Sequence, residues 1–395
     1  MEMNAFLHFT VNTFTDKEWG YGDEDPAVFN PTAFDADAIV AALKAGGMRG
    51  VILTCKHHDG FCLWPTATTK HHVQQGDIVR AISDAARRQG LKFGVYLSPW
   101  DRNSALYGKP EYVDLYRAQL RELLTQYGPI FEVWHDGANG GDGFYGGARE
   151  NRLIDKRTYY DWPTTWNLVR KLQPDAVIFS DVGPDIRWVG NEKGYAGETC
   201  WETYDPVAPD GGPAAPGFVR EQDLETGTRS GTHWMPAECD VSIRPGWLWH
   251  EKENARVKTP RQLLDLHYRS VGRGANLLLN VPPDRRGLLH ENDIASLKGF
   301  GELVRKTFAT NLGRNNVTFN VVRVREDIRM GQRVDAFELD YRTGGEWKTF
   351  AKATSIGACR IIRTKEDITA QEVRLRVTQS SAPPLISEFG TYREG

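Results

Sequence analysis

The chain has 395 residues, 40% of them hydrophobic, and a formal net charge of −3 at pH 7. This length predicts one large domain plus a small one, and the near-neutral charge argues against a nucleic-acid or anionic-membrane binder. No run of 18 apolar residues occurs, so no membrane span is predicted.

Short apolar runs alternate with helix-length segments over the first 300 residues. The predicted strands are 5–10, 50–60, 92–101, 130–136, 176–181, 232–238 and 276–283. The predicted helices are 34–46, 77–90, 111–127, 159–173, 262–272 and 291–305. The segment 183–231 is rich in Gly and Pro and is predicted to be an irregular, functional loop.

Polar or aromatic residues follow one predicted strand after another. They include His8, the pair His57 and His58, Tyr96 and Asp136. In a (β/α)8 barrel the C-terminal strand ends converge on one mouth, so the pattern favours an α/β fold of the (β/α)8-like TIM-barrel type. A doubly wound sheet, which also places ligands at strand ends, stays open as an alternative.

The sequence pattern changes after about residue 305, where short segments of alternating apolar and polar residues, typical of strands, are joined by turns. We therefore predict a catalytic barrel over 1–305 and a small C-terminal β-sandwich over 306–395. Fewer than 90 residues after 306 are few for two packed sheets, so this module is expected to be incomplete.

The five cysteines match no zinc spacing. They are Cys55, Cys62, Cys200, Cys239 and Cys359. We expect free buried thiols, although Cys55 and Cys62 could pair across a loop.

Asp136 is the strongest candidate for a catalytic residue. An apolar run, 130–134, leads directly to it, and a glycine-rich loop follows. A strand can hold such a carboxylate rigidly while the loop leaves room for a substrate. The alternative is an Asp that caps the following loop, which is common after a strand.

If Asp136 is the nucleophile of a glycosidase, a second carboxyl group must lie roughly 5–5.5 Å away in a retaining enzyme. The candidates are Glu192, Glu198, Glu202 and Glu238. Spacing along the sequence cannot choose among them.

His57 and His58 stand in the segment KHHDGF. Neutral imidazoles can bind sugar hydroxyls, whereas a metal site would need a third ligand at a usual spacing. Purely structural histidines are the other alternative. The pair Glu18 and Trp19 would suit one hydroxyl and one apolar face of a sugar ring.

Together, six segments resemble the α-L-fucosidases of glycoside hydrolase family 29. They are HFTVNTFTDKEWG, LTCKHHDGFCLWPT, VWHDGANG, GPDIRWVGNE, ECDVSIRPGW and LLLNVPPDRRG. The last four particularly resemble the subfamily that prefers α-1,3/1,4-linked fucose. The family's N-terminal lead-in and the earlier strands of its C-terminal module, around 311–316, are missing from the pattern.

The resemblance implies a retaining double displacement with no metal and no cofactor. It places the nucleophile at Asp136 and the acid/base at Glu192, with Glu198 or Glu238 as the alternatives. It implies a fucose pocket that includes His8, Glu18, Trp19, His57, His58, Trp64, Tyr96 and Trp134. Arg244, Trp247 and Trp249 are expected in the pocket or a neighbouring subsite.

The expected substrate is a fucosylated oligosaccharide or glycoconjugate of the Lewis or N-glycan type, with no nucleic-acid partner and no membrane insertion. Although no leader is visible, the expected location is a secreted, periplasmic or lysosome-like compartment; the oligomeric state stays open. The alternatives are an inactive fucose-binding protein, a retaining glycosidase for another sugar such as galactose, and a metal-dependent amidohydrolase.

Overall fold

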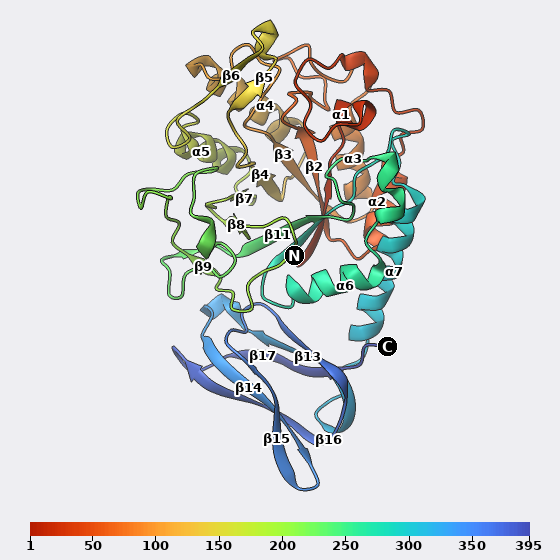
Figure 1. The fold of residues 1–395 in the computed structure, drawn as a ribbon, viewed down its shortest axis with the longest axis vertical. Helices are drawn as coiled ribbons and strands as arrows, with labels where there is room; N and C mark the ends of the chain where they lie inside the picture. Colours follow the sequence, from red (N-terminus) through yellow and green to blue (C-terminus); the bar gives the residue numbers. More distant parts are fainter.

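The computed structural model describes residues 1–395. Eight parallel strands close into a barrel in the order β1-β12-β11-β8-β7-β4-β3-β2 (Figure 1), which confirms the barrel over the doubly wound sheet. The barrel strands are β1 (Met3–Leu7), β2 (Gly50–Lys56), β3 (Lys92–Leu97), β4 (Glu132–Trp134), β7 (Val177–Ser180), β8 (Ile186–Trp188), β11 (Ala237–Ser242) and β12 (Asn276–Asn280).

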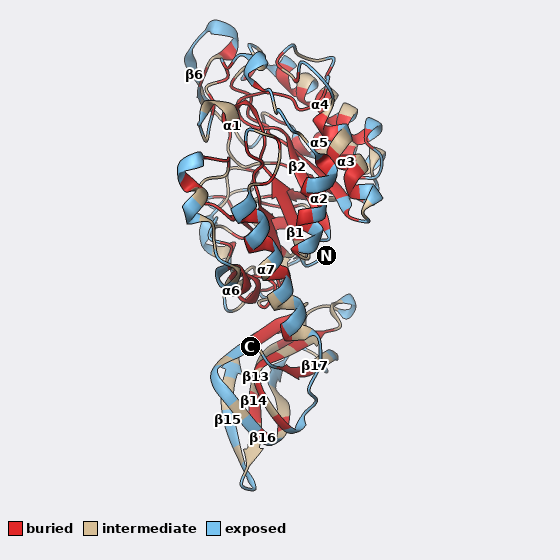
Figure 2. Ribbon diagram, turned by 90° about the vertical axis from the view of Figure 1, so that its right-hand side faces the viewer, coloured by how far each residue is buried: buried red, intermediate tan, exposed pale blue.

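Helices cover the outside of the barrel, with their buried faces on the strands (Figure 2). They are α1 (Val11–Thr15), α2 (Ala36–Ala45), α3 (Ile78–Arg88), α4 (Pro110–Gln126), α5 (Trp162–Leu172), α6 (Pro260–Arg269) and α7 (Glu291–Phe308). Asp35 and Asp77 cap α2 and α3, and Thr259 forms a capping box at α6. None of these helices is both long and apolar enough to cross a bilayer.

The two halves of the barrel differ in regularity. At least one α-helix follows each of the barrel strands β1, β2, β3 and β4, but no α-helix lies between β7 and β8 or between β8 and β11. The latter connection holds only the short elements β9 (Thr203–Tyr204), η3 (Glu221–Asp223) and β10 (His233–Trp234). The other short elements are η1 (Pro26–Val28), β5 (Gly141–Gly143), η2 (Tyr145–Gly147), β6 (Glu150–Arg152) and η4 (Glu251–Arg256).

Two strand predictions were wrong here. β8 lies inside the segment predicted to be wholly irregular, and β11 begins near the end of the predicted strand 232–238. β8 has only three residues, too few to show a period. The buried positions Glu238 and Asp240 of β11 are charged, so its hydrophobic pattern is interrupted.

The C-terminal residues form one antiparallel sheet in the order β15-β14-β16-β13-β17. Its elements are β13 (Asn315–Glu326), η5 (Ile328–Met330), β14 (Val334–Thr343), β15 (Glu346–Ala353), β16 (Arg360–Ser380) and β17 (Ile386–Tyr392). The 21-residue β16 pairs first with β13 and then with β14. This part of the predicted module is therefore one long strand and not a series of short ones. A small core lies between the strands, including Phe319, Phe337 and Leu339.

The sheet contacts the barrel through the segment that follows β8. Glu202 N donates to Gln332 Oε1 at 2.9 Å, and Gln332 Nε2 donates to Cys200 O at 3.0 Å. Arg360 Nη1 donates to Glu198 O at 2.5 Å. These bonds attach the long connection between β8 and β11 to the C-terminal sheet.

Candidate active site

A cavity of about 290 Å³ lies at the carboxyl ends of the barrel strands. This volume is near the lower limit of small-molecule sites, roughly 300–1,000 Å³. Six Phe, Tyr or Trp residues, three histidines and five carboxylic acids line the cavity, together with four small or aliphatic residues. The residues are Phe6, His8, Trp19, His57, His58, Tyr96, Trp134, Asp136, Gly137, Ala138, Asp181, Trp188, Glu192, Gly217, Val219, Glu221, Asp240 and Trp247.

Asp136 lies in the cavity wall just beyond the end of β4. Tyr96 donates its hydroxyl to Asp136 Oδ2 at 2.8 Å, and Ala138 N donates to Oδ1 at 2.7 Å. Two donors on two different oxygens fix the plane of the carboxylate. Asp136 therefore does cap the loop that follows it, through the bond from Ala138 N, as the alternative expected from the sequence would have it. Its carboxylate also lines the cavity.

Three histidines stand around this carboxylate. Burial lowers the pKa of His8 to about 3, and burial also lowers the pKa values of His57 and His58. All three rings are therefore neutral at pH 7. His57 and His58 have ring centroids 4.2 Å apart, and His58 Nε2 lies 3.8 Å from Asp136 Oδ2.

The hydrogen bonds of the rings fix which nitrogen is free. Ser98 Oγ donates its only proton to Trp100 O at 2.8 Å, so it must accept from His58 Nδ1, which lies 2.7 Å away. Nε2 of the neutral His58 ring is then an acceptor. By the same reasoning, Asn280 Oδ1 accepts from His8 Nδ1 at 3.0 Å, which leaves His8 Nε2 as an acceptor.

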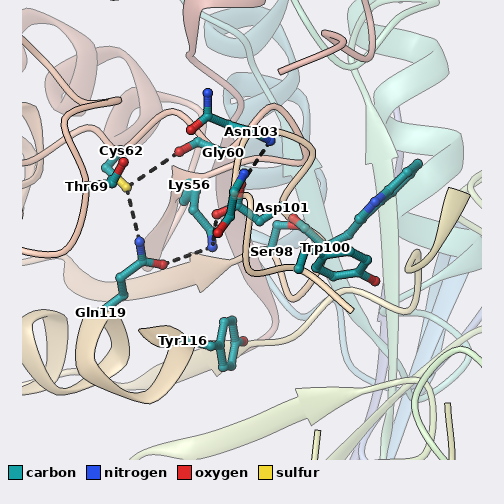
Figure 3. A network of polar contacts seen from close by, with 12 residues as sticks. Lys56, Gly60, Cys62, Thr69, Ser98, Trp100, Asp101, Asn103, Tyr116 and Gln119 are labelled. Atoms are coloured by element: carbon teal, nitrogen blue, oxygen red, sulfur yellow. Dashed lines mark hydrogen bonds and ion pairs between the residues drawn. The ribbon is translucent and has the colours of Figure 1, made fainter. Parts of the chain in front are cut away.

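A buried polar network beneath the histidines holds their loop in place (Figure 3). Lys56, directly before His57, donates to Asp101 Oδ2 at 3.2 Å and to Gln119 Oε1 at 2.9 Å, and its side chain is fully buried. Asp101 in turn accepts from the backbone after β3. A buried amine costs much free energy unless it is paired, so this network links the loops after β2 and β3 rigidly.

The remaining wall comes from Trp247, after β11. Its backbone N–H donates to Glu18 Oε2 at 2.9 Å, and its carbonyl accepts from Asn280 Nδ2 at 2.8 Å. His250 Nε2 lies 2.6 Å from Glu18 Oε1. Glu18 is occupied by these contacts and holds Trp247, while its neighbour Trp19 lines the cavity and is half exposed.

Glu192 lies in the same cavity, on the segment after β8. Trp247 Nε1 donates to Glu192 Oε2 at 3.2 Å. Burial raises the pKa of Glu192, the Trp247 hydrogen bond opposes this, and the negative charge of Asp136 raises it further. The two carboxyls are thus close enough to influence one another, and their environments push Glu192 towards its protonated form.

The other glutamates considered from the sequence do not line the cavity. Glu198 is 81% exposed and pairs with Arg273. Glu202 is buried and accepts from Ala358 N of the C-terminal sheet region. Glu238 lies under the floor, where Trp134 Nε1 donates to its Oε1 at 3.0 Å.

Glu238 forms a buried pair with Glu132 inside the barrel. Burial raises the pKa of Glu238 to about 7, and burial together with the charge of Glu238 raises the pKa of Glu132 well above its usual range. Two carboxyls this close cannot both ionise without water, so the pair holds a proton at neutral pH. It supports Trp134, which stacks on Phe179 with ring centroids 4.0 Å apart.

Four predicted pocket residues do not line the cavity: Glu18, whose contacts are given above, Trp64, Arg244 and Trp249. Trp64 is buried in the main core and donates to Glu122 Oε2 at 2.7 Å. Arg244 makes a buried ion pair with Asp293 at 2.6 Å. Trp249 is buried as well, with the Arg285 guanidinium 5.7 Å from its ring centroid. Trp64, Arg244 and Trp249 belong to segments that carry the family resemblance, but their side chains pack against other residues and do not line the cavity.

The sequence reasoning also missed several lining residues. They are Phe6, Asp181, Trp188, Val219, Glu221 and Asp240. Asp181 ends the predicted strand 176–181, so the strand-end rule applied to Asp136 would have found it. Asp240 was hidden because β11 was misplaced; Trp188 Nε1 donates to its Oδ1 at 2.8 Å, and burial raises its pKa well above the usual range.

All five cysteines are buried and free, which confirms that expectation. No group of three or more His, Cys, Asp or Glu side chains is arranged to hold a metal ion.

Comparison with known proteins identifies the family. The α-L-fucosidase family profile matches residues 1–307. Alpha-L-fucosidase 1 of Arabidopsis thaliana is 40% identical over 449 aligned positions, covering 99% of this chain and 85% of the plant protein. The human plasma α-L-fucosidase is 31% identical, covering 68% of this chain and 53% of the human protein.

Solved structures agree. A glycoside hydrolase 29 family member from an unknown rumen bacterium superposes with a TM-score of 0.94 at 44% identity, covering 100% of this chain and 76% of that one. A Ruminococcus gnavus glycoside hydrolase 29 fucosidase in complex with fucose has a TM-score of 0.86 at 29% identity, with 100% and 93% covered. The chain therefore belongs to the α-L-fucosidases of glycoside hydrolase family 29.

Proposed function

We propose that this enzyme releases terminal α-1,3/1,4-linked fucose from Lewis-type or N-glycan oligosaccharides by a retaining double displacement. Asp136 attacks the anomeric carbon while the carboxylic acid of Glu192 donates its proton to the leaving oxygen. Glu192, now ionised, accepts a proton from water, which attacks the same carbon and releases fucose. The single observation that carries this proposal is that Asp136 and Glu192 line one small cavity.

The surroundings of the two carboxyls support these different roles. Two hydrogen bonds hold the carboxylate of Asp136 in place, as a positioned nucleophile requires. Burial and the charge of Asp136 raise the pKa of Glu192, as a general acid requires. Once Asp136 is bonded to the sugar its charge is gone, so the pKa of Glu192 falls and the group becomes a better base for the second step.

The rest of the cavity suits a deoxyhexose. The free Nε2 atoms of His8 and His58 can accept hydrogen bonds from ring hydroxyls. The aromatic side chains Phe6, Trp134 and Trp247 offer an apolar surface for a ring face or the C6 methyl group. A pocket shaped for that methyl discriminates against a sugar without it by about 1–3 kcal/mol.

The stereochemical claim is tested by NMR of the sugar first released from an aryl α-L-fucoside. We expect α-L-fucose, which then mutarotates to the β-anomer. Initial release of β-L-fucose would contradict the double displacement, because a single displacement inverts the anomeric carbon.

The substrate claim is tested with two oligosaccharides in parallel. A Lewis-type trisaccharide, in which fucose is α-1,3- or α-1,4-linked, should be cleaved much faster than a 2′-fucosylated one. A preference for the 2′-fucosylated sugar would contradict the linkage. Calorimetric binding of fucosylated glycans with no release of fucose would favour the inactive binding protein, and faster hydrolysis of a nitrophenyl galactoside would favour the other sugar.

A further inference from the structure

Three loops meet beside Asp136 at a contact that the mechanism above does not use. They are the loop after β4, the turn after β7, and the connection between β8 and β11, which together contribute Gly137, Asp181 and Gly217. We call these three residues the clasp. All three line the cavity.

The clasp is closely packed. Gly217 N donates to Asp181 Oδ2 at 2.7 Å. A Cβ atom on Gly217 would lie 2.2 Å from Gly137 O, and one on Gly137 would lie 2.2 Å from Asp181 Oδ2. The Gly217 position therefore excludes any side chain, because the atom met there is backbone, whereas a side chain at Gly137 would have to displace the carboxylate of Asp181. Gly217 also has a φ of +76°, a conformation that glycine adopts without strain.

The loop held in this way carries two further lining residues, Val219 and Glu221. Val219 packs against the small cluster of Tyr204, Leu224 and Met235. Glu221 is exposed, and no protein group donates a hydrogen bond to its carboxylate, so its oxygens are available to hydroxyl groups of a ligand.

The position of this loop indicates what it contacts. The histidines and Tyr96 come from β1, β2 and β3, whereas Val219 and Glu221 come from the opposite part of the barrel, with Glu192 and Trp188. Glu192 must face the leaving oxygen if it is the acid, and this part of the argument rests on the function proposed above. The loop then borders the leaving group and not the fucose ring.

We propose that Asp181 is a positioning residue that selects sugar leaving groups. Its carboxylate anchors Gly217 on the loop of the nucleophile, and this places Val219 and Glu221 against the sugar to which fucose is attached. Val219 offers an apolar contact and Glu221 accepts from a hydroxyl group of that sugar. A small aryl leaving group needs neither contact.

The test compares Asp181→Ala with Asp181→Asn on two substrates, an aryl α-L-fucoside and a fucosylated trisaccharide. For Asp181→Ala we expect kcat/KM on the trisaccharide to fall about 10- to 100-fold, mainly through KM, while the aryl fucoside changes less than about threefold. The inhibition constant of free fucose should be unchanged. Asp181→Asn keeps an acceptor for Gly217 N and should restore most of the trisaccharide activity.

A second pair of variants tests the clasp from the other side. Gly217→Ala introduces the clash and should reproduce the Asp181→Ala pattern. Gly211→Ala is the matched control, since Gly211 lies in the same connection with a φ of +82° but has no atom within 4 Å of its Cβ position. It should retain the ratio of the two activities.

Equal losses on both substrates, or weaker inhibition by fucose, would show that Asp181 serves the fucose site and would overturn the proposal. An unchanged trisaccharide rate in Asp181→Ala would overturn it too. Failure of the function proposed above is seen separately, because the wild-type enzyme would then release no fucose from the trisaccharide.

Discussion

The two halves of the barrel contribute to the cavity in different ways. The regular half, β1 to β4, supplies His8, His57, His58, Tyr96 and Asp136 from its strands or from positions directly after them, and buried polar bonds hold these residues. The irregular half, β7 to β11, supplies Asp181, Trp188 and Asp240 from its strands or the turn after β7, and Glu192 and Glu221 from the long connection without α-helices. Rigid strand ends suit the recognition of one constant sugar, whereas a long loop suits variable leaving groups.

The largest effect is expected in the regular half. Asp136→Ala should lower kcat on an aryl fucoside and on a trisaccharide alike, on the order of 10⁴-fold, because no covalent intermediate can form. Asp114, an exposed carboxylate on α4, gives the control variant Asp114→Ala, which should be fully active. Near-normal activity of Asp136→Ala, measured by fucose release, would show that Asp136 is not the nucleophile.

Glu192→Ala, a substitution in the irregular half, should affect the two substrates to different extents. Hydrolysis of the trisaccharide should slow by roughly 10²–10⁴-fold, since its leaving group needs a proton. The aryl fucoside should suffer less in the first step, because its leaving group is a weak base. The control is Glu198→Ala, a substitution at an exposed glutamate on the same segment. If both substrates lose activity equally in steady-state and burst measurements, Glu192 is not the proton donor.

Tyr96→Phe tests the regular half alone. The hydroxyl donates to Asp136 Oδ2 at 2.8 Å, and a hydrogen bond to a charged group contributes about 1.5–3 kcal/mol. We expect kcat/KM to fall about 10- to 100-fold on both substrates, with no change in their ratio. A selective loss on the trisaccharide would contradict the division into halves.

The smallest effect concerns stability. Burial raises the pKa of Glu238 from 4.5 to about 7, so the folded protein keeps a proton that the unfolded chain loses. The free energy of unfolding therefore falls as pH rises from about 5 to above 7. Glu238→Gln removes this loss, and urea unfolding should show the variant gaining about 1–3 kcal/mol on the wild type between pH 5 and pH 8. If the free energies of unfolding of the two proteins changed with pH in parallel, this would contradict a buried, protonated pair.

The same division explains what the sequence could predict. In the regular half, apolar strands alternate with capped helices, and a polar residue follows each strand, so the elements and His8, His57, His58 and Asp136 were found. In the irregular half no periodicity marks the three residues of β8, and charged interior positions interrupt β11. The residues Glu221 and Asp240 were therefore not found.

The motif resemblance pointed to Glu192, which lines the cavity, and also to Trp64, Arg244 and Trp249, which do not. A motif reports which segments lie near a site, whereas side-chain direction depends on packing partners far away in the chain. Asp293, the partner of Arg244, is 49 residues distant, and Glu122, the partner of Trp64, is 58 residues distant.

The hydrogen bonds between the C-terminal sheet and residues 198–202 have a mechanical consequence. The backbone that leaves the proposed proton donor runs, within ten residues, into anchors provided by Gln332 and Arg360. The sheet thus acts as a buttress for the wall that carries the proposed proton donor, whereas buried polar bonds inside the barrel hold the wall that carries the histidines. Heat or truncation that loosens this buttress should therefore reduce the selectivity among glycans before it weakens the binding of fucose.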